Sequence, residues 1–147
     1  MLRSDPYNFV SRFVTPHTIH FGQAISEIRA GRKQGHWIWF LLPTPPFILN
    51  GLEVGSPINR LHCLRSDEEV NAYLSFQHPL IDLRKNYVNL VGEIETAVAR
   101  GGGGPQGLRR VMGADDVKCA SSLSLFERVA RDGDVKVVCS RTLKLCR

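Results

Sequence analysis

Apolar residues recur along most of the chain with the spacing of amphipathic helices. The clearest stripe lies between Pro79 and Arg100, where large apolar side chains return every three or four positions. A second stripe precedes Gly31, a residue type that often ends a helix in a left-handed conformation. Further helices are predicted over 106–112 and about 115–131. The two main stripes consist of Leu80, Leu83, Tyr87, Leu90, Val91, Ile94 and Val98, and of Phe21, Ala24, Ile25 and Ile28.

Capping residues mark where several helices begin. Asp5-Pro6 and Thr15-Pro16 each combine a side chain that accepts a hydrogen bond from a free backbone amide with a proline suited to the first turn. We therefore predict that one helix ends and another begins near residue 15. Ser66, with Glu69 three residues later, has the spacing of a capping box and predicts a further helix.

The segment from Gly31 to Pro43 holds both tryptophans and the longest apolar run. As a strand it would place Trp37 and Trp39 on one face, and its aromatic and β-branched content favours that form. The surrounding helices, however, offer it no partner strands. We therefore predict a short buried helix, followed by an irregular proline-rich loop over 43–57. No paired strands are predicted anywhere in the chain.

Together these signals predict an all-α fold of about six to eight helices in a single domain over residues 1–147. A chain of this length can bury roughly 68–70% of its unfolded surface. The glycine-rich stretch 101–105 is predicted to be a flexible connector. Its formal match to G-x-G-x-x-G follows a helix rather than a strand, so no dinucleotide site is predicted. Residues 135–145 fit either a helix or a short extended piece.

Composition narrows the functional classes. The chain is 43% hydrophobic and 22% charged, which is ordinary for a soluble globular protein, and its longest apolar run is far too short to cross a membrane. The first residues contain no apolar signal segment, and the four cysteines are widely spaced. We therefore expect a cytoplasmic protein with free thiols. His17 and His20 lack a third ligand nearby in the sequence, so no metal or cofactor is predicted.

A basic C-terminal tail supplies most of the net charge of +5. Residues 131–147 carry five cations and two carboxylates, and so contribute +3. Such a tail can contact polyanions, but it lacks interleaved aromatics and any nucleic-acid reader motif. A solvated terminus is therefore favoured over nucleic-acid binding. One functional hypothesis is a non-catalytic interaction module that presents this tail, or the proline-rich loop Pro43–Pro46, to a protein partner.

Four separated motifs carry a family resemblance. They are Asp5-Pro6-Tyr7-Asn8-Phe9 with Arg12-Phe13-Val14; Gly31-Arg32-Lys33 with His36-Trp37-Ile38-Trp39-Phe40; Ala72-Tyr73-Leu74 with His78-Pro79-Leu80; and Asp116-x-Lys118 with Ser121-Ser122-Leu123-x-Leu125-Phe126. In this order they resemble a family catalogued as domain of unknown function 1810, whose members are sometimes labelled calpastatin. The resemblance implies a mostly α-helical array. The calpastatin label implies little, because nothing in the chain resembles an extended inhibitory repeat.

The chain departs from the family pattern in two places. Where the family usually reads Phe-Pro-Gln after the tryptophans, this chain has Leu42-Pro43-Thr44 and then a proline-rich insertion. The stretch after Arg131 is also shorter than the family's C-terminus. These two departures bear on whether a role of the family's glutamine, or of its final helix, carries over to this chain.

Cationic side chains surround the two tryptophans. Arg32, Lys33 and His36 could hold a phosphate or carboxylate, while the indole of Trp37 or Trp39 stacks on a ring. The alternative is that the indoles are core anchors and the cations form a solvated joint between helices, since large aromatics most often serve packing. If the site is catalytic, hydrolase or glycohydrolase chemistry with His36 or an acid as general base is expected.

The helix predicted over about 115–131 offers further polar groups. Lys118 and Ser122 are neighbours at i,i+4 and, with Ser121, resemble a nucleophile and its lysine, although serine hydroxyls are also common at helix contacts. Asp115 and Asp116 diverge by roughly 100° on a helix and fit capping better than an acid pair. Our leading hypothesis is a small anionic or nucleotide-like ligand, bound where this helix meets the Gly31–Phe40 segment.

Overall fold

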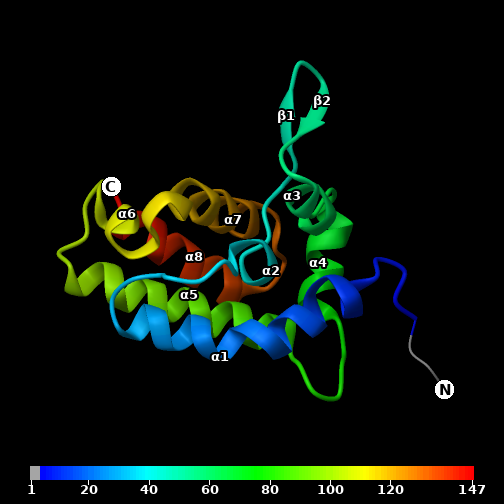
Figure 1. The fold of residues 1–147 in the computed structure, drawn as a ribbon, viewed down its shortest axis with the longest axis horizontal. Helices are drawn as coiled ribbons and strands as arrows, with labels where there is room; N and C mark the ends of the chain where they lie inside the picture. Colours follow the sequence, from blue (N-terminus) through cyan, green and yellow to red (C-terminus); the bar gives the residue numbers. More distant parts are fainter. Residues whose placement is uncertain (1–3) are drawn as a thin grey trace.

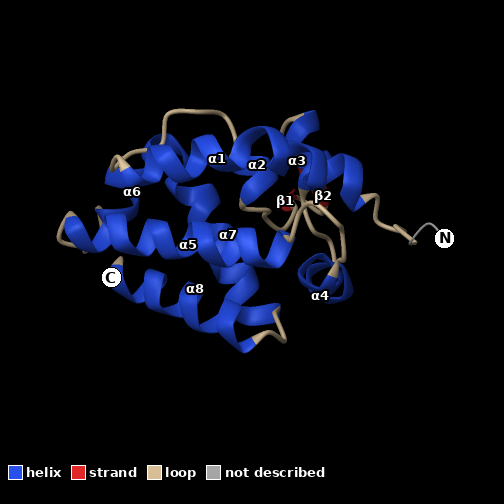
Figure 2. Ribbon diagram, turned by 90° about the horizontal axis from the view of Figure 1, so that it is seen from below, coloured by secondary structure: helices blue, strands red, loops and turns tan. Residues whose placement is uncertain are grey.

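Helices make up most of the structure, which confirms the all-α fold (Figures 1 and 2). The computed structural model describes residues 4–147. None of the helices among these residues has both the length and the apolar character needed to cross a membrane. In chain order the elements are the π-helix η1 (Val10–Val14), α1 (Thr15–Arg29), α2 (Ile38–Leu41), β1 (Phe47–Leu49), β2 (Leu52–Val54), α3 (Pro57–His62), α4 (Asp67–Ser75), α5 (Leu83–Arg100), α6 (Gly107–Met112), the 3₁₀ helix η2 (Gly113–Asp115), α7 (Asp116–Val129) and α8 (Gly133–Leu145).

Helix α5 is the rod against which α1, α4, α6 and α8 pack. Its buried side chains are Leu83, Tyr87, Leu90, Val91, Ile94, Ala97 and Val98, so the predicted stripe faces the core. The predicted start at Pro79 is wrong. Asp82 caps the helix by accepting a hydrogen bond from the Lys85 backbone amide at 3.0 Å, and Leu80 lies before this cap with 81% of its surface exposed.

The predicted boundary near residue 15 is confirmed, because η1 ends at Val14 and α1 begins at Thr15, although the backbone stays helical across the junction. The Asp5 carboxylate accepts hydrogen bonds from the backbone amides of Phe9 and Val10, as its capping role requires. The Thr15 amide then bonds to the Val10 carbonyl across a wide π-turn. A proline ring clashes with the carbonyl four residues earlier in a regular helix, and the wider turn relieves that clash.

The tryptophan segment forms the short buried helix that we predicted. Helix α2 covers only Ile38–Leu41 and contacts α1 and α3. Trp37, just before it, and Leu42, just after it, are both fully buried. The segment therefore belongs to the hydrophobic core that all the larger helices share.

Residues 47–54 form a β-hairpin rather than an irregular loop. Phe47 pairs with Val54 and Leu49 with Leu52 in an antiparallel register. Asn50 and Gly51 connect the strands with φ values of +52° and +79°, the left-handed pair that a two-residue type I′ turn requires. The prediction of no paired strands is thus wrong. In Figure 1 the hairpin projects from the helical body beyond α3.

The basic C-terminal segment is a packed helix, not a solvated tail. Asp132 caps α8 by accepting hydrogen bonds from the backbone amides of Asp134 and Val135. Val135, Val138, Cys139 and Thr142 are buried, and the helix lies against both α5 and α7. An apolar face at helical spacing therefore anchors the segment, while four of its five cations are exposed.

The glycine-rich stretch forms a hydrogen-bonded turn that joins the ends of α5 and α8. The Gly103 amide donates to the Val98 carbonyl at 3.0 Å, and the Gly104 amide donates to the Leu145 carbonyl at 2.7 Å. Gly103 has a φ of +65°, and a Cβ there would lie 2.8 Å from the Leu145 oxygen, so glycine is required for this close approach. That this stretch is flexible stays a prediction.

Candidate functional site

A carboxylate joins the two segments in which we predicted the site. Lys33 Nζ lies 2.6 Å from Asp115 Oδ2, and Lys118 Nζ lies 3.0 Å from Asp115 Oδ1. Each ammonium group also lies over an indole, Lys33 at 4.9 Å from the ring centroid of Trp37 and Lys118 at 4.6 Å from that of Trp39. Two of the predicted residues, Lys33 and Lys118, therefore meet at Asp115, and each lies beside one of the two predicted tryptophans.

Lys33 and Lys118 stabilise the ionised form of Asp115. Partial burial alone would raise the pKa of Asp115, but the hydrogen bonds from Lys33 and Lys118 keep it below its usual value. The carboxylate is therefore ionised at neutral pH. It makes no capping hydrogen bond to α7, so the capping role predicted for Asp115 is wrong. Its place at the helix start instead lets it reach a loop more than 80 residues earlier in the chain.

Trp37 is sequestered by protein on all sides. It has 0% exposure, and its Nε1 donates a hydrogen bond to Glu27 Oε1 at 2.9 Å. The same oxygen accepts the backbone amides of Gln34 and Gly35, each at 2.8 Å. Burial acts to raise the pKa of Glu27, but these hydrogen bonds outweigh it and lower the pKa to about 2. Trp37 therefore has the geometry of a core anchor.

The remaining predicted residues divide between the core and the surface. Ser122 is fully buried, and its hydroxyl lies 3.0 Å from that of Tyr87 on α5. Burial raises the pKa of Tyr87 well above its usual value, so this pair is neutral. Ser121 is half-buried, whereas Arg32 and His36 are exposed. The structure thus brings Lys118, but not Ser122, to the tryptophan segment.

A buried histidine links three helices. The pKa of His17 is lowered to about 4 because burial outweighs its hydrogen bond to the Phe40 carbonyl, so its ring is neutral at pH 7. The Asn86 amide nitrogen lies 3.1 Å from Nδ1, and the Phe40 oxygen lies 3.1 Å from Nε2. This network assigns the ring hydrogen to Nε2.

Among residues 4–147, no group of three or more His, Cys, Asp or Glu side chains gathers in a way that could hold a metal ion.

A buried arginine, Arg12, fixes α3 to the body of the molecule. Its guanidinium forms an ion pair with Glu69 at 2.7 Å and donates to the carbonyls of Leu61 and Cys63, each at 2.8 Å. A further hydrogen bond reaches the Tyr7 carbonyl at 2.9 Å. We did not predict this role. The available signal was a lone arginine within the apolar stripe of the first helix.

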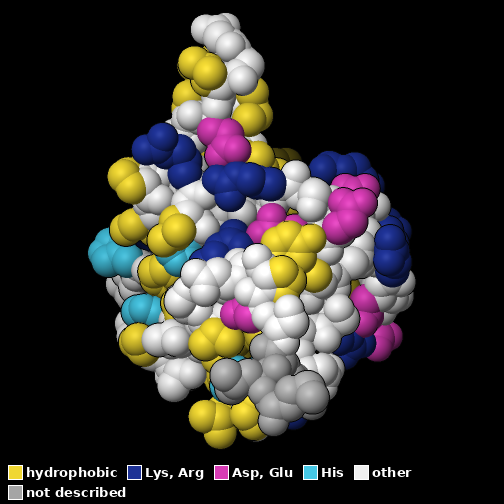
Figure 3. All heavy atoms as spheres, turned by 90° about the vertical axis from the view of Figure 1, so that its right-hand side faces the viewer, with side chains coloured by type: hydrophobic (Ala, Val, Ile, Leu, Met, Phe, Trp, Pro, Cys, Tyr) yellow, Lys and Arg dark blue, Asp and Glu magenta, His cyan; other side chains and the backbone are white. Residues whose placement is uncertain are grey.

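A group of exposed apolar side chains lies on the hairpin and on α3. We define this hairpin surface as Ile48, Leu49, Leu52, Val54, Ile58 and Leu61, which are 39% to 71% exposed. These are six of the eleven large apolar side chains that are exposed among residues 4–147. Figure 3 shows apolar side chains along the projecting hairpin and at its foot, where charged side chains border them. Exposed apolar side chains that gather on one projecting element are typical of an interaction site.

The two faces of the hairpin differ in polarity. Directly paired residues of antiparallel strands share a face, so Phe47, Val54, Leu49 and Leu52 lie together on one side. The third pair, Ile48 with Glu53, lies on the other side. One face is therefore entirely apolar, and the charge of the hairpin is confined to the opposite face.

Polar contacts anchor the foot of the hairpin. Glu53 accepts hydrogen bonds from Arg65 Nε at 2.9 Å and Nη2 at 2.8 Å, and these bonds hold the pKa of Glu53 below its usual value. Gly55 turns the chain into α3 with a φ of +112°, and a Cβ there would lie 2.3 Å from Asn59 Oδ1. The amide of Asn59 is buried without a hydrogen-bond partner among the described residues. The turn from the hairpin into α3 is therefore tightly packed, and it contains a buried amide without a hydrogen-bond partner among the described residues.

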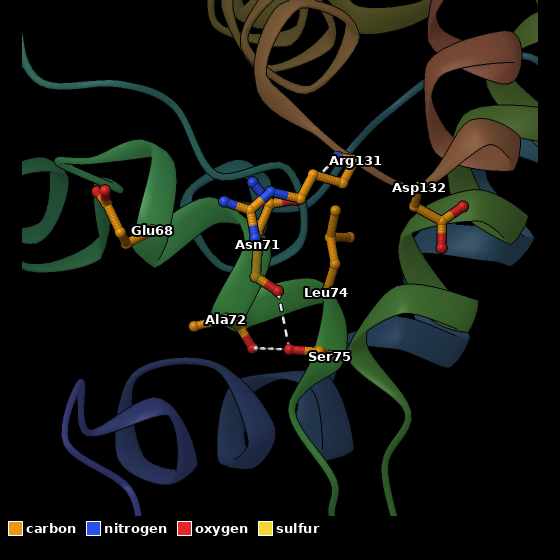
Figure 4. A pocket seen from close by; sticks show the side chains of 7 residues that line it. All are labelled: Glu68, Asn71, Ala72, Leu74, Ser75, Arg131 and Asp132. Carbon is orange, nitrogen blue, oxygen red and sulfur yellow. Dashed lines mark hydrogen bonds between the residues drawn. The ribbon is translucent and has the colours of Figure 1, made fainter.

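A pocket lies between α4 and the linker that joins α7 to α8 (Figure 4). It has a volume of about 500 Å³ and is lined by Glu68, Asn71, Ala72, Leu74, Ser75, Arg131 and Asp132. Asn71 donates to the Val129 carbonyl at 3.2 Å and accepts from the Arg131 amide at 2.8 Å. Ser75 donates back to the Asn71 carbonyl at 2.9 Å, as Figure 4 shows. The two hydrogen bonds of the Asn71 side chain hold α4 to the linker.

Comparisons with known proteins show a family and, separately, a solved structure of similar fold. A family model described as "Protein of unknown function (DUF1810)" matches residues 7–144. The chain is similar to the crystal structure of the conserved hypothetical protein Rv1873 from Mycobacterium tuberculosis, determined at 1.38 Å, with 30% sequence identity and a TM-score of 0.73. The match covers 97% of this chain and 89% of that chain. A search of curated proteins finds no match.

Proposed function

We propose that this chain, which belongs to the DUF1810 family of proteins of unknown function, is a non-catalytic protein-interaction module that docks through its hairpin surface. Family membership confirms the resemblance seen in its motifs. The observation that carries the proposal is the concentration of exposed apolar side chains on Ile48–Leu61. Complete burial of a fully exposed large apolar side chain is worth about 1.5–3 kcal/mol, and these side chains, which are 39% to 71% exposed, would gain a corresponding fraction of it.

The architecture of the hairpin supports this role. A two-stranded sheet of three-residue strands is marginal in water unless something covers it. The Glu53–Arg65 pair and the Arg12 hydrogen bonds to α3 give it a fixed base on the helical body. The hairpin also lies in the proline-rich segment where the chain departs from the family pattern. Docking would therefore be a property of this chain rather than of the whole family.

The sequence suggests two locations for an interaction site, the basic segment 131–147 and the proline-rich loop Pro43–Pro46. The basic segment 131–147 contributes a packed helix to the core, so its buried positions Val135, Val138 and Cys139 are not available to a partner. The proline-rich loop leads directly into β1 and its exposed face. Of the two locations, the loop is the one that supports docking.

Affinity capture from a lysate tests the proposal with matched variants. We expect proteins that the wild-type chain retains to be lost with Leu52→Asp, which places a charge on the apolar face. The control is Leu80→Asp, because Leu80 is 81% exposed and Leu52 is 71% exposed, but Leu80 lies away from the hairpin. Circular dichroism establishes that both variants fold. Retention of the same proteins by Leu52→Asp would contradict the proposal.

A second candidate function is the binding of a small anion beside Trp39. It is favoured by one observation: two lysines, Lys33 and Lys118, meet a single carboxylate and leave an excess positive charge. Arg32 adds to this charge, because its guanidinium reaches to within 3.7 Å of where a Cβ of Gly113 would lie, at the turn before α7.

Thermal-shift measurements with inorganic phosphate, ATP and ADP-ribose test this second function. We expect a rise in melting temperature that is reduced by Arg32→Ala and by Lys118→Ala. Arg141→Ala is a control, since Arg141 is an exposed arginine that pairs with Glu95 on another face. Absence of any shift with all three anions would remove the candidate.

A further inference from the structure

We infer that the partner of the hairpin surface is a second copy of this chain, so that the protein forms a two-fold homodimer. The inference rests on the proposed docking function and adds the identity of the occupant. It is drawn from the polarity of the two hairpin faces, from the two strand edges and from the area of the surface.

The apolar face of the hairpin is complementary to itself. Its four side chains, from Phe47, Leu49, Leu52 and Val54, carry no charge and no hydrogen-bonding group. A two-fold axis brings a surface onto its own copy, so each side chain would meet apolar atoms. Glu53 lies on the opposite face and is neutralised there by Arg65. Face-to-face packing therefore places no like charges against each other.

Pairing between strand edges is disfavoured by comparison. Pro45 and Pro46 come directly before β1, so no backbone donor is available to lengthen that edge. An antiparallel pair of β2 edges centred on its middle residue would set the two Glu53 carboxylates opposite each other. A three-residue edge also offers few hydrogen bonds. The face, rather than the edge, is the contact that a second copy would use.

Helix α3 enlarges the contact at the foot of the hairpin. Ile58 and Leu61 are spaced i,i+3 and so lie on the same side of the helix, with exposures of 50% and 59%. Ile48 lies on the opposite face of the hairpin and is left out of this contact. The other five side chains of the hairpin surface present an area on the order of 500 Å² per copy, or about 1,000 Å² for two copies, which is near the lower limit for a specific interface. We therefore expect a reversible dimer rather than an obligate one.

Sedimentation of the purified full chain across a concentration series, from low micromolar to near millimolar, tests the inference. We expect the wild-type mass to rise from one chain to two. Leu49→Asp and Leu52→Asp should stay at one chain throughout, while Leu80→Asp should behave as wild type. A wild-type mass of one chain at every concentration would overturn the inference, as would a dimer that survives Leu52→Asp.

Cross-linking provides a second measurement that does not depend on removing the contact. Cys63, Cys119 and Cys139 are buried and Cys146 is half-buried, so an added surface cysteine should react first. With a short bis-maleimide, we expect Leu52→Cys to give a cross-linked dimer and Leu80→Cys to give little. Equal yields from both variants would count against a dimer through the hairpin.

The same variants separate the failure of this inference from that of the proposed function. If the wild-type chain stays monomeric but captures another protein in a manner that depends on Leu52, the homodimer is excluded and the docking function stands. If neither association nor capture depends on Leu52, both are excluded.

Discussion

The tryptophan segment and the hairpin are both rich in large apolar residues, yet the first is buried and the second is exposed. Trp37 is fully buried, and its only polar atom donates to Glu27. Leu52 is 71% exposed on a face that no other part of the described chain covers. The difference lies in the surroundings: the tryptophan segment has helices on several sides, whereas the hairpin extends beyond them (Figure 1). Apolar content alone therefore does not distinguish a core element from a docking element.

The largest expected difference between the two regions is in stability. Trp37→Ala removes a fully buried indole and leaves a cavity, which should lower the free energy of unfolding by about 3–5 kcal/mol. Leu52→Ala removes a side chain that is mostly in water, and should change it by less than about 0.5 kcal/mol. Urea unfolding of both variants at a concentration where the chain is monomeric measures the contrast. Similar losses in the two variants would refute it.

Asp115 allows a test of how firmly the tryptophan segment is tied to α7. Asp115→Asn removes the negative charge that faces two ammonium groups, and leaves Lys33, whose side chain is only 5% exposed, without its ion-pair partner. We expect a loss of about 2–3 kcal/mol, somewhat below the value for a wholly buried pair because Asp115 is 20% exposed.

Thermal unfolding at neutral pH measures the effect of Asp115→Asn. Asp116→Asn is the control, since Asp116 lies 4.0 Å from an exposed arginine and should contribute little. Equal effects of the two changes would show that the ion pair with Lys33 has no special role.

Glu27 makes the stability of the tryptophan segment depend on pH. Its pKa is lowered to about 2 in the folded chain from an ordinary value near 4.5. A lowered folded-state pKa stabilises the fold above the unfolded value, and this stabilisation is lost as the pH falls toward 2.

Glu27→Gln should therefore cost about 1–2 kcal/mol at pH 7, reduced by solvent screening at this partly exposed site, and the cost should shrink between pH 5 and pH 2. Chemical unfolding at several pH values measures it, with Glu93→Gln on the neighbouring helix as the control. A cost that does not vary over this pH range would contradict the assigned cause.

Local patterns in the sequence account for what could be predicted, and distance along the chain accounts for most of what could not. The apolar stripe from Leu83 to Val98 follows helical spacing, so the sequence alone predicts this helix and its buried face. The convergence of Lys33 and Lys118 on Asp115 depends on how a loop meets a helix, which no local pattern records.

The hairpin was not predicted either, although the sequence signal for it is local. Asn50-Gly51 between apolar residues is typical of a type I′ turn, but strands of three residues are too short to show a clear alternation. The apolar positions of α8 were likewise present in the sequence, and its cations masked them.

The smallest expected effect concerns the turn from the hairpin into α3. This turn and the tryptophan segment differ in whether their buried polar groups have hydrogen-bond partners. The indole nitrogen of Trp37 has its acceptor, whereas both amide atoms of Asn59 are buried without a partner among the described residues. A buried polar group without a hydrogen bond is destabilising, so Asn59→Leu, which is similar in size and apolar, should raise the free energy of unfolding by about 1 kcal/mol. Thermal unfolding measures the gain, and the sedimentation behaviour should stay that of the wild type because Asn59 is not on the surface of the hairpin. A loss of stability would instead mean that an ordered water satisfies the amide, and that the turn is as well hydrogen-bonded as the core beside Trp37.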